Sequence, residues 1–124
     1  MNDKKYSEIF TVEENDCISK IDTSLPNLLG TYTLVKWMEI VCAKSINRKL
    51  NNQFITVGKK VSIEHTDMVK LNESVEIISL IIDEGKRNIK FEIEAISNGK
   101  IIATASHHRI KIPVKIISRF FKET

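Results

Sequence analysis

The chain has 124 residues, of which 42% are hydrophobic and 28% are charged. These proportions are typical of a soluble globular protein and exclude a disordered acidic chain or a fibrous protein, and the length predicts a single domain over residues 1–124. The net charge of +3 suits a phosphate-bearing ligand but is too small for a dedicated nucleic-acid-binding protein.

Cysteine usage and hydropathy bear on location and cofactors. Cys17 and Cys42 lack the spacing of metal ligands, and the first ten residues lack the apolar stretch of a signal peptide. The most apolar window, residues 28–43, contains Lys36 and Glu39 and is shorter than the ~20 residues of a membrane span. We therefore expect a cytoplasmic protein with no metal, no other cofactor and no membrane partner.

The first half of the chain predicts one strand and one long helix. Residues 8–12 form a short strand candidate, and a polar loop through Pro26 and Gly30 follows. Apolar residues then recur at three- and four-residue steps, which predicts a helix from about residue 31 to residue 50 with one buried face. That face comprises Leu34, Val35, Met38, Val41, Cys42, Ser45, Ile46 and Lys49.

In the second half of the chain the hydrophobic residues recur with a period of two, which predicts strands. In the first strand Gly58 lies in the middle, and one side is expected to hold Ile55, Val57, Val61, Ile63 and His65. Three more strands are expected at residues 74–83, 88–96 and 100–112, and Asn98-Gly99 is a strong hairpin signal between the last two. Beyond Pro113, the pattern favours a short amphipathic helix, with a trailing edge strand as the alternative.

This order predicts an α+β fold, with an antiparallel sheet of about five strands around one long central helix. A single helix covers only part of such a sheet, and the strands at 74–83 and 100–112 lack a clean polar face. Further surface should therefore be buried against a second subunit, which predicts a homodimer or a dimer of dimers.

Two ionisable residues lie near the predicted core. Glu39 flanks the apolar stripe of the helix, so its carboxylate should be partly buried with a raised pKa, as for a base or nucleophile. The alternative is a surface Glu paired with Lys36 or with charges near Arg48. His65 should face the helix, where imidazole can act as acid, base or hydrogen-bond donor, and a structural core histidine is the alternative.

Two further positions suggest contact with a carbonyl oxygen. Thr31 lies at the predicted helix start, where free N–H groups favour an oxyanion, although it can equally be an N-cap. Gly58 in mid-strand permits close backbone approach and an N–H donor to a ligand, or else marks a β-bulge.

The last strand and the basic residues are less informative. His107 and Arg109 share one face of the strand and His108 takes the other, so the two histidines cannot easily chelate one metal ion. Cys42 is expected to be a buried structural thiol. A phosphate-binding rim, or only a solubilising set of charges, is offered by Lys59, Lys60, Arg109, Lys111, Lys115 and Arg119.

Taken together, Thr31, Glu39, Gly58 and His65 resemble the hotdog-fold thioesterases, specifically the fluoroacetyl-CoA thioesterase-like family. That family has a Thr, a Glu eight residues later and a His 26 residues beyond, and this sequence has the same intervals. The resemblance covers about residues 25–112, and Arg109 falls where the family has an arginine in its last strand.

The resemblance implies an acyl-CoA thioesterase for short acyl chains. Thr31, Glu39 and His65 would be catalytic, in a site at a dimer interface, with Glu39 acting as general base or by forming an anhydride. Gly58, Arg109 and Leu25 would contact the substrate. The family's aromatic lid aligns with Asp22 and Leu25, so fluoroacetyl selectivity is not expected. The alternative is a non-catalytic acyl-CoA-binding hotdog dimer, a sensor or partner module.

Overall fold

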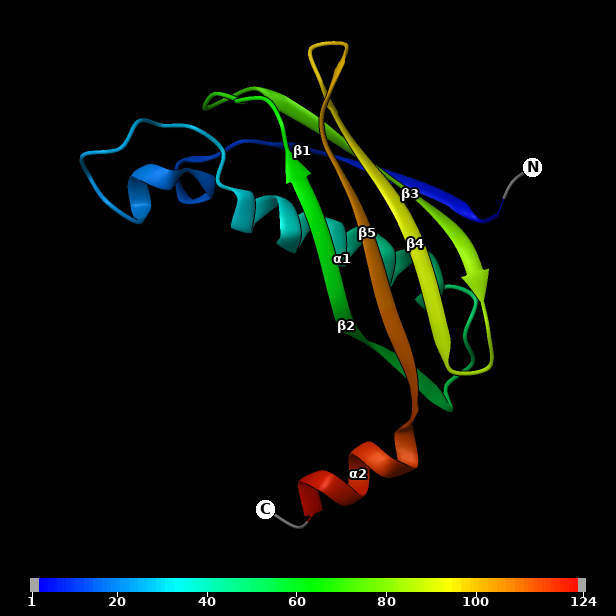
Figure 1. The fold of residues 1–124 in the computed structure, drawn as a ribbon. Coiled ribbons are helices and arrows are strands. Elements are labelled where there is room, and N and C mark those ends of the chain that lie inside the picture. Colours follow the sequence, from blue (N-terminus) through cyan, green and yellow to red (C-terminus); the bar gives the residue numbers. More distant parts are fainter. Residues whose placement is uncertain (1–2, 123–124) are drawn as a thin grey trace.

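The computed structural model describes residues 3–122. Within them the chain forms one five-stranded sheet and a long helix, which confirms the α+β prediction (Figure 1). In chain order the elements are β1 (Lys5–Thr11), the 3-10 turns η1 (Glu14–Asp16) and η2 (Ile18–Lys20), α1 (Thr31–Asn47), β2 (Phe54–His65), β3 (Ser74–Glu84), β4 (Asn88–Ser97), β5 (Lys100–Pro113) and α2 (Val114–Lys122). The helix α1 ends three residues before the predicted boundary, and a turn follows it.

The sheet has the strand order β1-β3-β4-β5-β2, and every neighbouring pair is antiparallel. The predicted hairpin between β4 and β5 is confirmed. Asn98 and Gly99 have φ values of 52° and 78°, the positive angles that a two-residue hairpin turn requires at both positions. β1 and β2 are the edge strands, and within residues 3–122 β2 pairs with β5 alone.

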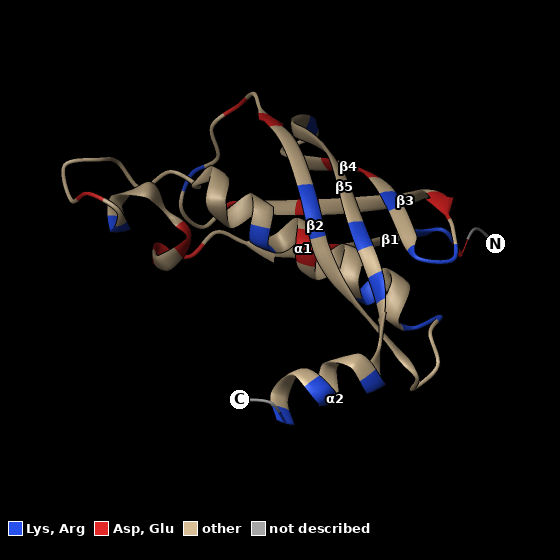
Figure 2. Ribbon diagram, turned by 60° about the horizontal axis from the view of Figure 1, so that its bottom comes forward, with Lys and Arg blue, Asp and Glu red and all other residues tan. Residues whose placement is uncertain are grey.

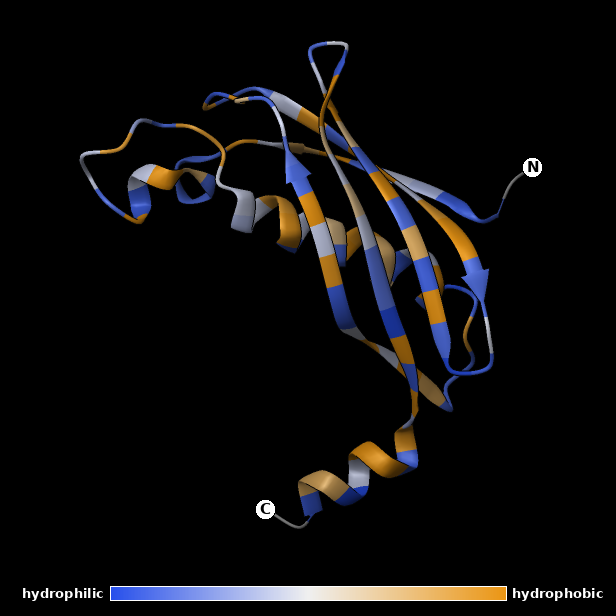
Figure 3. Ribbon diagram, viewed as in Figure 1, coloured by the Kyte–Doolittle hydropathy of each residue, from blue (hydrophilic) through white to orange (hydrophobic). Residues whose placement is uncertain are grey.

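The core lies between α1 and the face of the sheet that curves around it (Figure 1). On β4, Ile89, Phe91, Ile93 and Ala95 are buried while the residues between them are exposed, so the predicted alternation is confirmed and is visible in Figure 3. The helix contributes a buried stripe at the predicted three- and four-residue spacing, which consists of Leu34, Met38, Val41, Cys42 and Ile46 together with Trp37.

The strand β2 departs from the predicted pattern because it contains a β-bulge. Gly58 pairs with Arg109 and Lys60 pairs with His108, so Lys59 is an extra residue. The bulge reverses the alternation: Thr56 is buried, whereas Ile55 and Val57 are exposed. The expectation that these two apolar residues share a side with Val61, Ile63 and His65 is therefore wrong, although the bulge offered as the alternative for Gly58 is present.

Apolar side chains also remain exposed on the outer surface. Ile82 of β3 is 49% exposed, and Phe120 of α2 is 62% exposed. The predicted C-terminal helix is confirmed as α2, which extends away from the sheet beyond the end of β5 (Figure 1). No helix in the described part of the chain is long and apolar enough to cross a membrane.

Candidate active site

The first residue of α1 and the last residue of β2 are joined by a hydrogen bond. Thr31 Oγ1 lies 2.9 Å from Nδ1 of His65, so His65 faces the helix as predicted. The N-cap of α1 is Gly30, which has extended backbone angles, and Thr31 is the next residue. The N-cap alternative for Thr31 is therefore wrong, and its hydroxyl is hydrogen-bonded to His65.

The second ring nitrogen of His65 is buried and has no hydrogen-bond partner within residues 3–122. A buried polar atom without a partner is costly, and such atoms are uncommon in folded proteins. Since Thr31 occupies Nδ1, Nε2 is the atom through which this imidazole can exchange a proton with a bound molecule.

Glu39 lies further along α1, against Gly58 of β2. A Cβ atom at residue 58 would lie 2.5 Å from Glu39 Oε1, so only glycine leaves room for the carboxylate in this position. Among residues 3–122 no hydrogen bond or ion pair is formed by the Glu39 carboxylate. Neither the alternative pairing with Lys36 nor one with charges near Arg48 is formed in this part of the chain, and the Arg48 guanidinium lies over the Tyr6 ring instead, 4.9 Å from its centroid.

A buried polar network lies beside this carboxylate. Arg109, only 6% exposed, donates from Nε to Thr56 Oγ1 and from Nη2 to the Thr56 carbonyl, both at 3.0 Å. Its third nitrogen, Nη1, lies 3.2 Å from His107 Nε2. Arg109 is therefore not on a surface rim, contrary to one expectation for it. Sequence patterning missed Thr56, because the bulge moved it to the inner face.

The contacts of His107 fix its protonation. Nδ1 lies 2.8 Å from the carbonyl oxygen of Lys60, which can only accept, and Nε2 faces the Arg109 guanidinium, which can only donate. The ring is therefore neutral with its proton on Nδ1. Burial is the main cause that lowers the pKa of His107, and Arg109 adds to this effect against the opposing Lys60 hydrogen bond.

The thiols are structural, as predicted for Cys42. Burial raises the pKa of Cys42 to about 12, with a smaller contribution from Glu39 that Arg109 opposes. Burial also raises the pKa of Cys17. Both thiols are buried and stay protonated near neutral pH, so neither has the thiolate character of a nucleophile.

The structure thus forms two pairs from the predicted site residues, Thr31 with His65 and Glu39 with Gly58. Eight residues of helix separate Thr31 from Glu39, which corresponds to a rise of ~12 Å. Leu25 is 39% exposed in the loop between η2 and α1, which extends beyond the N-terminal end of α1 (Figure 1). A single chain therefore holds the two pairs at different points along one helix.

Solved structures show the same fold. The fluoroacetyl-CoA thioesterase FlK superposes with a TM-score of 0.87 at 15% sequence identity, covering 100% of this chain and 96% of that chain. A Thermus thermophilus member of the thioesterase superfamily superposes with a TM-score of 0.89 at 16% identity, covering 99% of this chain and 91% of that chain. A hot-dog-like protein from Thermanaerovibrio acidaminovorans superposes with a TM-score of 0.88 at 14% identity, covering 96% of this chain and 88% of that chain. The fold is the hotdog fold.

Family membership rests on the sequence itself. The model of the fluoroacetyl-CoA-specific thioesterase family, FlK, matches residues 12–115. Because this match spans most of the chain, the protein belongs to the FlK family and is a thioester hydrolase. A comparison with curated proteins gives no match.

We predict that Gly58→Ala displaces the Glu39 carboxylate and lowers kcat for thioester hydrolysis. The new Cβ would lie 2.5 Å from Oε1, and a misplacement of about 1 Å can cost ~10²-fold in rate. Gly85→Ala is the matched control, because a Cβ there meets only the Asn88 carbonyl at 3.4 Å. Equal kcat values for the Gly58→Ala variant and the wild type would show that this contact is unimportant.

We also predict that folding stability falls as the pH drops below about 6.5, the ordinary pKa of histidine. The folded state holds His107 neutral with a lowered pKa, so the unfolded chain takes up the proton first and stability is lost toward acid. Urea unfolding between pH 7 and 5 gives the free energy of unfolding at each pH. Its slope against pH should be smaller in His107→Gln than in the wild type, by at most about 1.4 kcal/mol per pH unit. Identical slopes would contradict the neutral assignment.

Proposed function

We propose that this protein is an acyl-CoA thioesterase that hydrolyses short-chain acyl-CoA to the free acid and CoA. The observation that carries the proposal is the hydrogen bond between Thr31 and His65, which leaves His65 Nε2 buried without a partner among residues 3–122. A histidine oriented through one nitrogen and free at the other is suited to proton transfer.

Glu39 is proposed to start the reaction. Its carboxylate is half-buried, has no ion-pair partner in the part of the chain that the structure describes, and lies beside a glycine, so a thioester carbonyl can approach it closely. As a general base, Glu39 takes a proton from water while the oxygen of that water attacks the carbonyl carbon. As a nucleophile, its own oxygen attacks and forms an anhydride that water then hydrolyses. In both routes the carbon–sulfur bond breaks and the CoA thiolate leaves.

The remaining residues stabilise charge and supply the proton. His65 Nε2 is proposed to deliver a proton to the departing thiolate, with Thr31 orienting the ring. The Gly58 N–H and the first N–H groups of α1 are donors for the carbonyl oxygen as it becomes negative. Arg109 Nη1, 3.6 Å from the position of a Cβ at residue 58, reaches the same space.

A second copy is proposed to complete the site. Because Thr31 and Glu39 are ~12 Å apart along one helix, both cannot reach one carbonyl from a single chain. The β2 edge is unpaired within residues 3–122, and exposed apolar residues flank it. A symmetric dimer would bring Glu39 of one copy to the Thr31–His65 pair of the other, twice per dimer.

Glu39→Gln and His65→Ala should each lower kcat by ~10²-fold or more, the scale expected for a lost base or acid. Thr31→Ser should be mild and Thr31→Ala more damaging, because the hydroxyl orients His65. Thiol release from acetyl-CoA measures both effects, and circular dichroism verifies the fold. Folded variants with near wild-type turnover would contradict these roles.

Mixing the Glu39→Gln and His65→Ala variants tests whether a working site combines residues from two chains. If subunits exchange at random, half of the dimers are mixed, and each mixed dimer has one intact site and one doubly altered site. Activity should therefore return to about a quarter of the wild-type value. No recovery after verified exchange would place Glu39 and His65 of a working site in the same chain, and a stable monomer by light scattering would exclude the shared site.

The substrate preference should be broad among short acyl groups. The resemblance aligns Asp22 and Leu25, in the loop before α1, with the family's aromatic lid, and neither side chain has a ring. We expect kcat/KM for fluoroacetyl-CoA to be similar to that for acetyl-CoA, and each added methylene to change discrimination by only ~1–3 kcal/mol. A fluoroacetyl preference of several orders of magnitude would contradict this expectation.

A further inference from the structure

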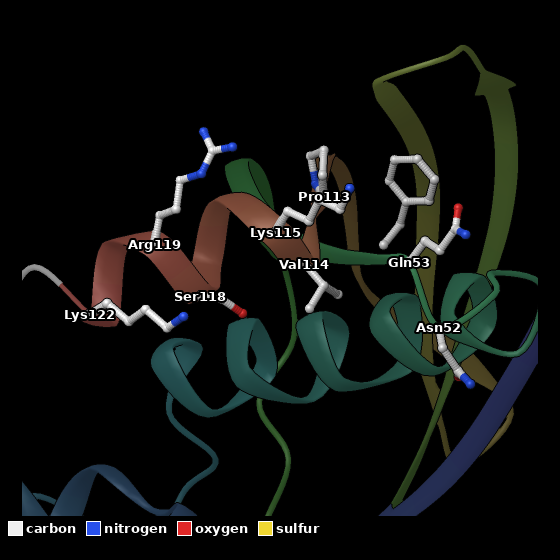
Figure 4. A pocket seen from close by; sticks show the side chains of 9 residues that line it. Asn52, Gln53, Pro113, Val114, Lys115, Ser118, Arg119 and Lys122 are labelled. Atoms are coloured by element: carbon white, nitrogen blue, oxygen red, sulfur yellow. The ribbon is translucent and has the colours of Figure 1, made fainter.

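The C-terminal helix α2 is amphipathic, and its polar side lines a pocket. Lys115, Ser118, Arg119 and Lys122 line this pocket, while the apolar residues Ile116 and Phe120 do not. The opposite wall consists of the segment that leads into β2, and the pocket volume is about 740 Å³ (Figure 4). A hydrogen bond from the Val114 N–H to the Gln53 carbonyl, at 2.9 Å, holds the helix against this wall.

The pocket is cationic, and none of the residues that line it in the described part of the chain is acidic. Lys115, Arg119 and Lys122 make no ion pair within the described part of the chain, and Figure 2 shows the basic residues spaced along α2. Arg and Lys side chains form short, charge-assisted hydrogen bonds with phosphate oxygens. Three unpaired cations around one hollow are thus complementary to a ligand with several phosphate groups.

The opposite wall carries groups that suit a nucleobase. Phe54 lines the pocket and is 37% exposed, and base–aromatic stacking tolerates any base. Asn52 and Gln53, the two preceding residues, also line the pocket (Figure 4), and their amides can both donate to and accept from the edge of an adenine. Phosphate and base recognition are therefore available in the same pocket.

The pocket also lies in line with the proposed catalytic carboxylate. Phe54 pairs with Pro113 and Gly58 pairs with Arg109, so the pocket and the Glu39 site occupy two points on one β2–β5 ladder. Four residues of strand separate them, which corresponds to ~13 Å. An extended pantetheine arm can cover such a distance, with its thioester at Glu39 and its phosphates at α2.

We propose that this pocket binds the 3′-phosphorylated ADP end of CoA. The proposal rests on the proposed acyl-CoA thioesterase function, and it assigns the substrate's nucleotide to Lys115, Arg119 and Lys122, with the adenine on Phe54.

The test compares Lys115→Gln/Arg119→Gln/Lys122→Gln with the wild type on two substrates. KM for acetyl-CoA should rise at least about tenfold, which is about 1.4 kcal/mol, with kcat unchanged. The rate with S-acetyl-pantetheine, which has no nucleotide, should not change. Lys70→Gln/Lys100→Gln is the matched control, because both lysines lie at the opposite end of the sheet and outside the pocket.

Titration of the full chain with 3′,5′-ADP provides a readout independent of catalysis. The triple variant and Phe54→Leu should both bind it at least about tenfold more weakly than the wild type, whereas the control should not. The proposal is overturned if 3′,5′-ADP binds no better than inorganic phosphate, or if the triple variant binds it like the wild type. It is also overturned if KM rises equally for both substrates, or if only the oligomeric state changes. A failure of the proposed function would appear separately, as no thiol release by the wild type from either substrate.

Discussion

The arrangement of the site depends on one extra residue in β2. Side chains along a strand alternate between faces, so Gly58 and His65, seven residues apart, would point in opposite directions in a regular strand. The bulge at Lys59 shifts the alternation by one residue, so Gly58 and His65 lie on the same face of β2, toward α1. The same insertion turns Thr56 inward, where it receives two hydrogen bonds from Arg109.

The electrostatics beside Glu39 follow from how Arg109 is held. A buried guanidinium needs acceptors for its N–H groups, and here these are a hydroxyl, a carbonyl and a neutral imidazole. None of these acceptors is charged, so Arg109 is fixed in place without neutralising its charge. Glu39 meanwhile has no ion-pair partner within residues 3–122. Under the proposed function, a carboxylate that is near a cation but not paired with it stays available as a base or nucleophile.

The helix α1 sets the separation of the two pairs. The helical rise places Thr31 and Glu39 ~12 Å apart, with Thr31 beside His65 and Glu39 beside Gly58 of β2. Under the proposed function this separation makes a second copy necessary, and the unpaired β2 edge offers a place for one. The exposed apolar side of α2, with Ile116 and Phe120, is further surface that an assembly can cover.

The helices and long strands, their order and the fold class could be predicted from local signals, namely hydrophobic periodicity and the Asn98-Gly99 turn. The same patterns marked Thr31, Glu39, Gly58 and His65 as unusual positions. The folded structure was needed to show that Thr31 contacts His65, that Glu39 lies against Gly58 and that Arg109 is buried. Those contacts depend on the bulge in β2 and on the packing of α1 across the sheet, and neither can be read from alternation, because a single inserted residue reverses which side chains face the core.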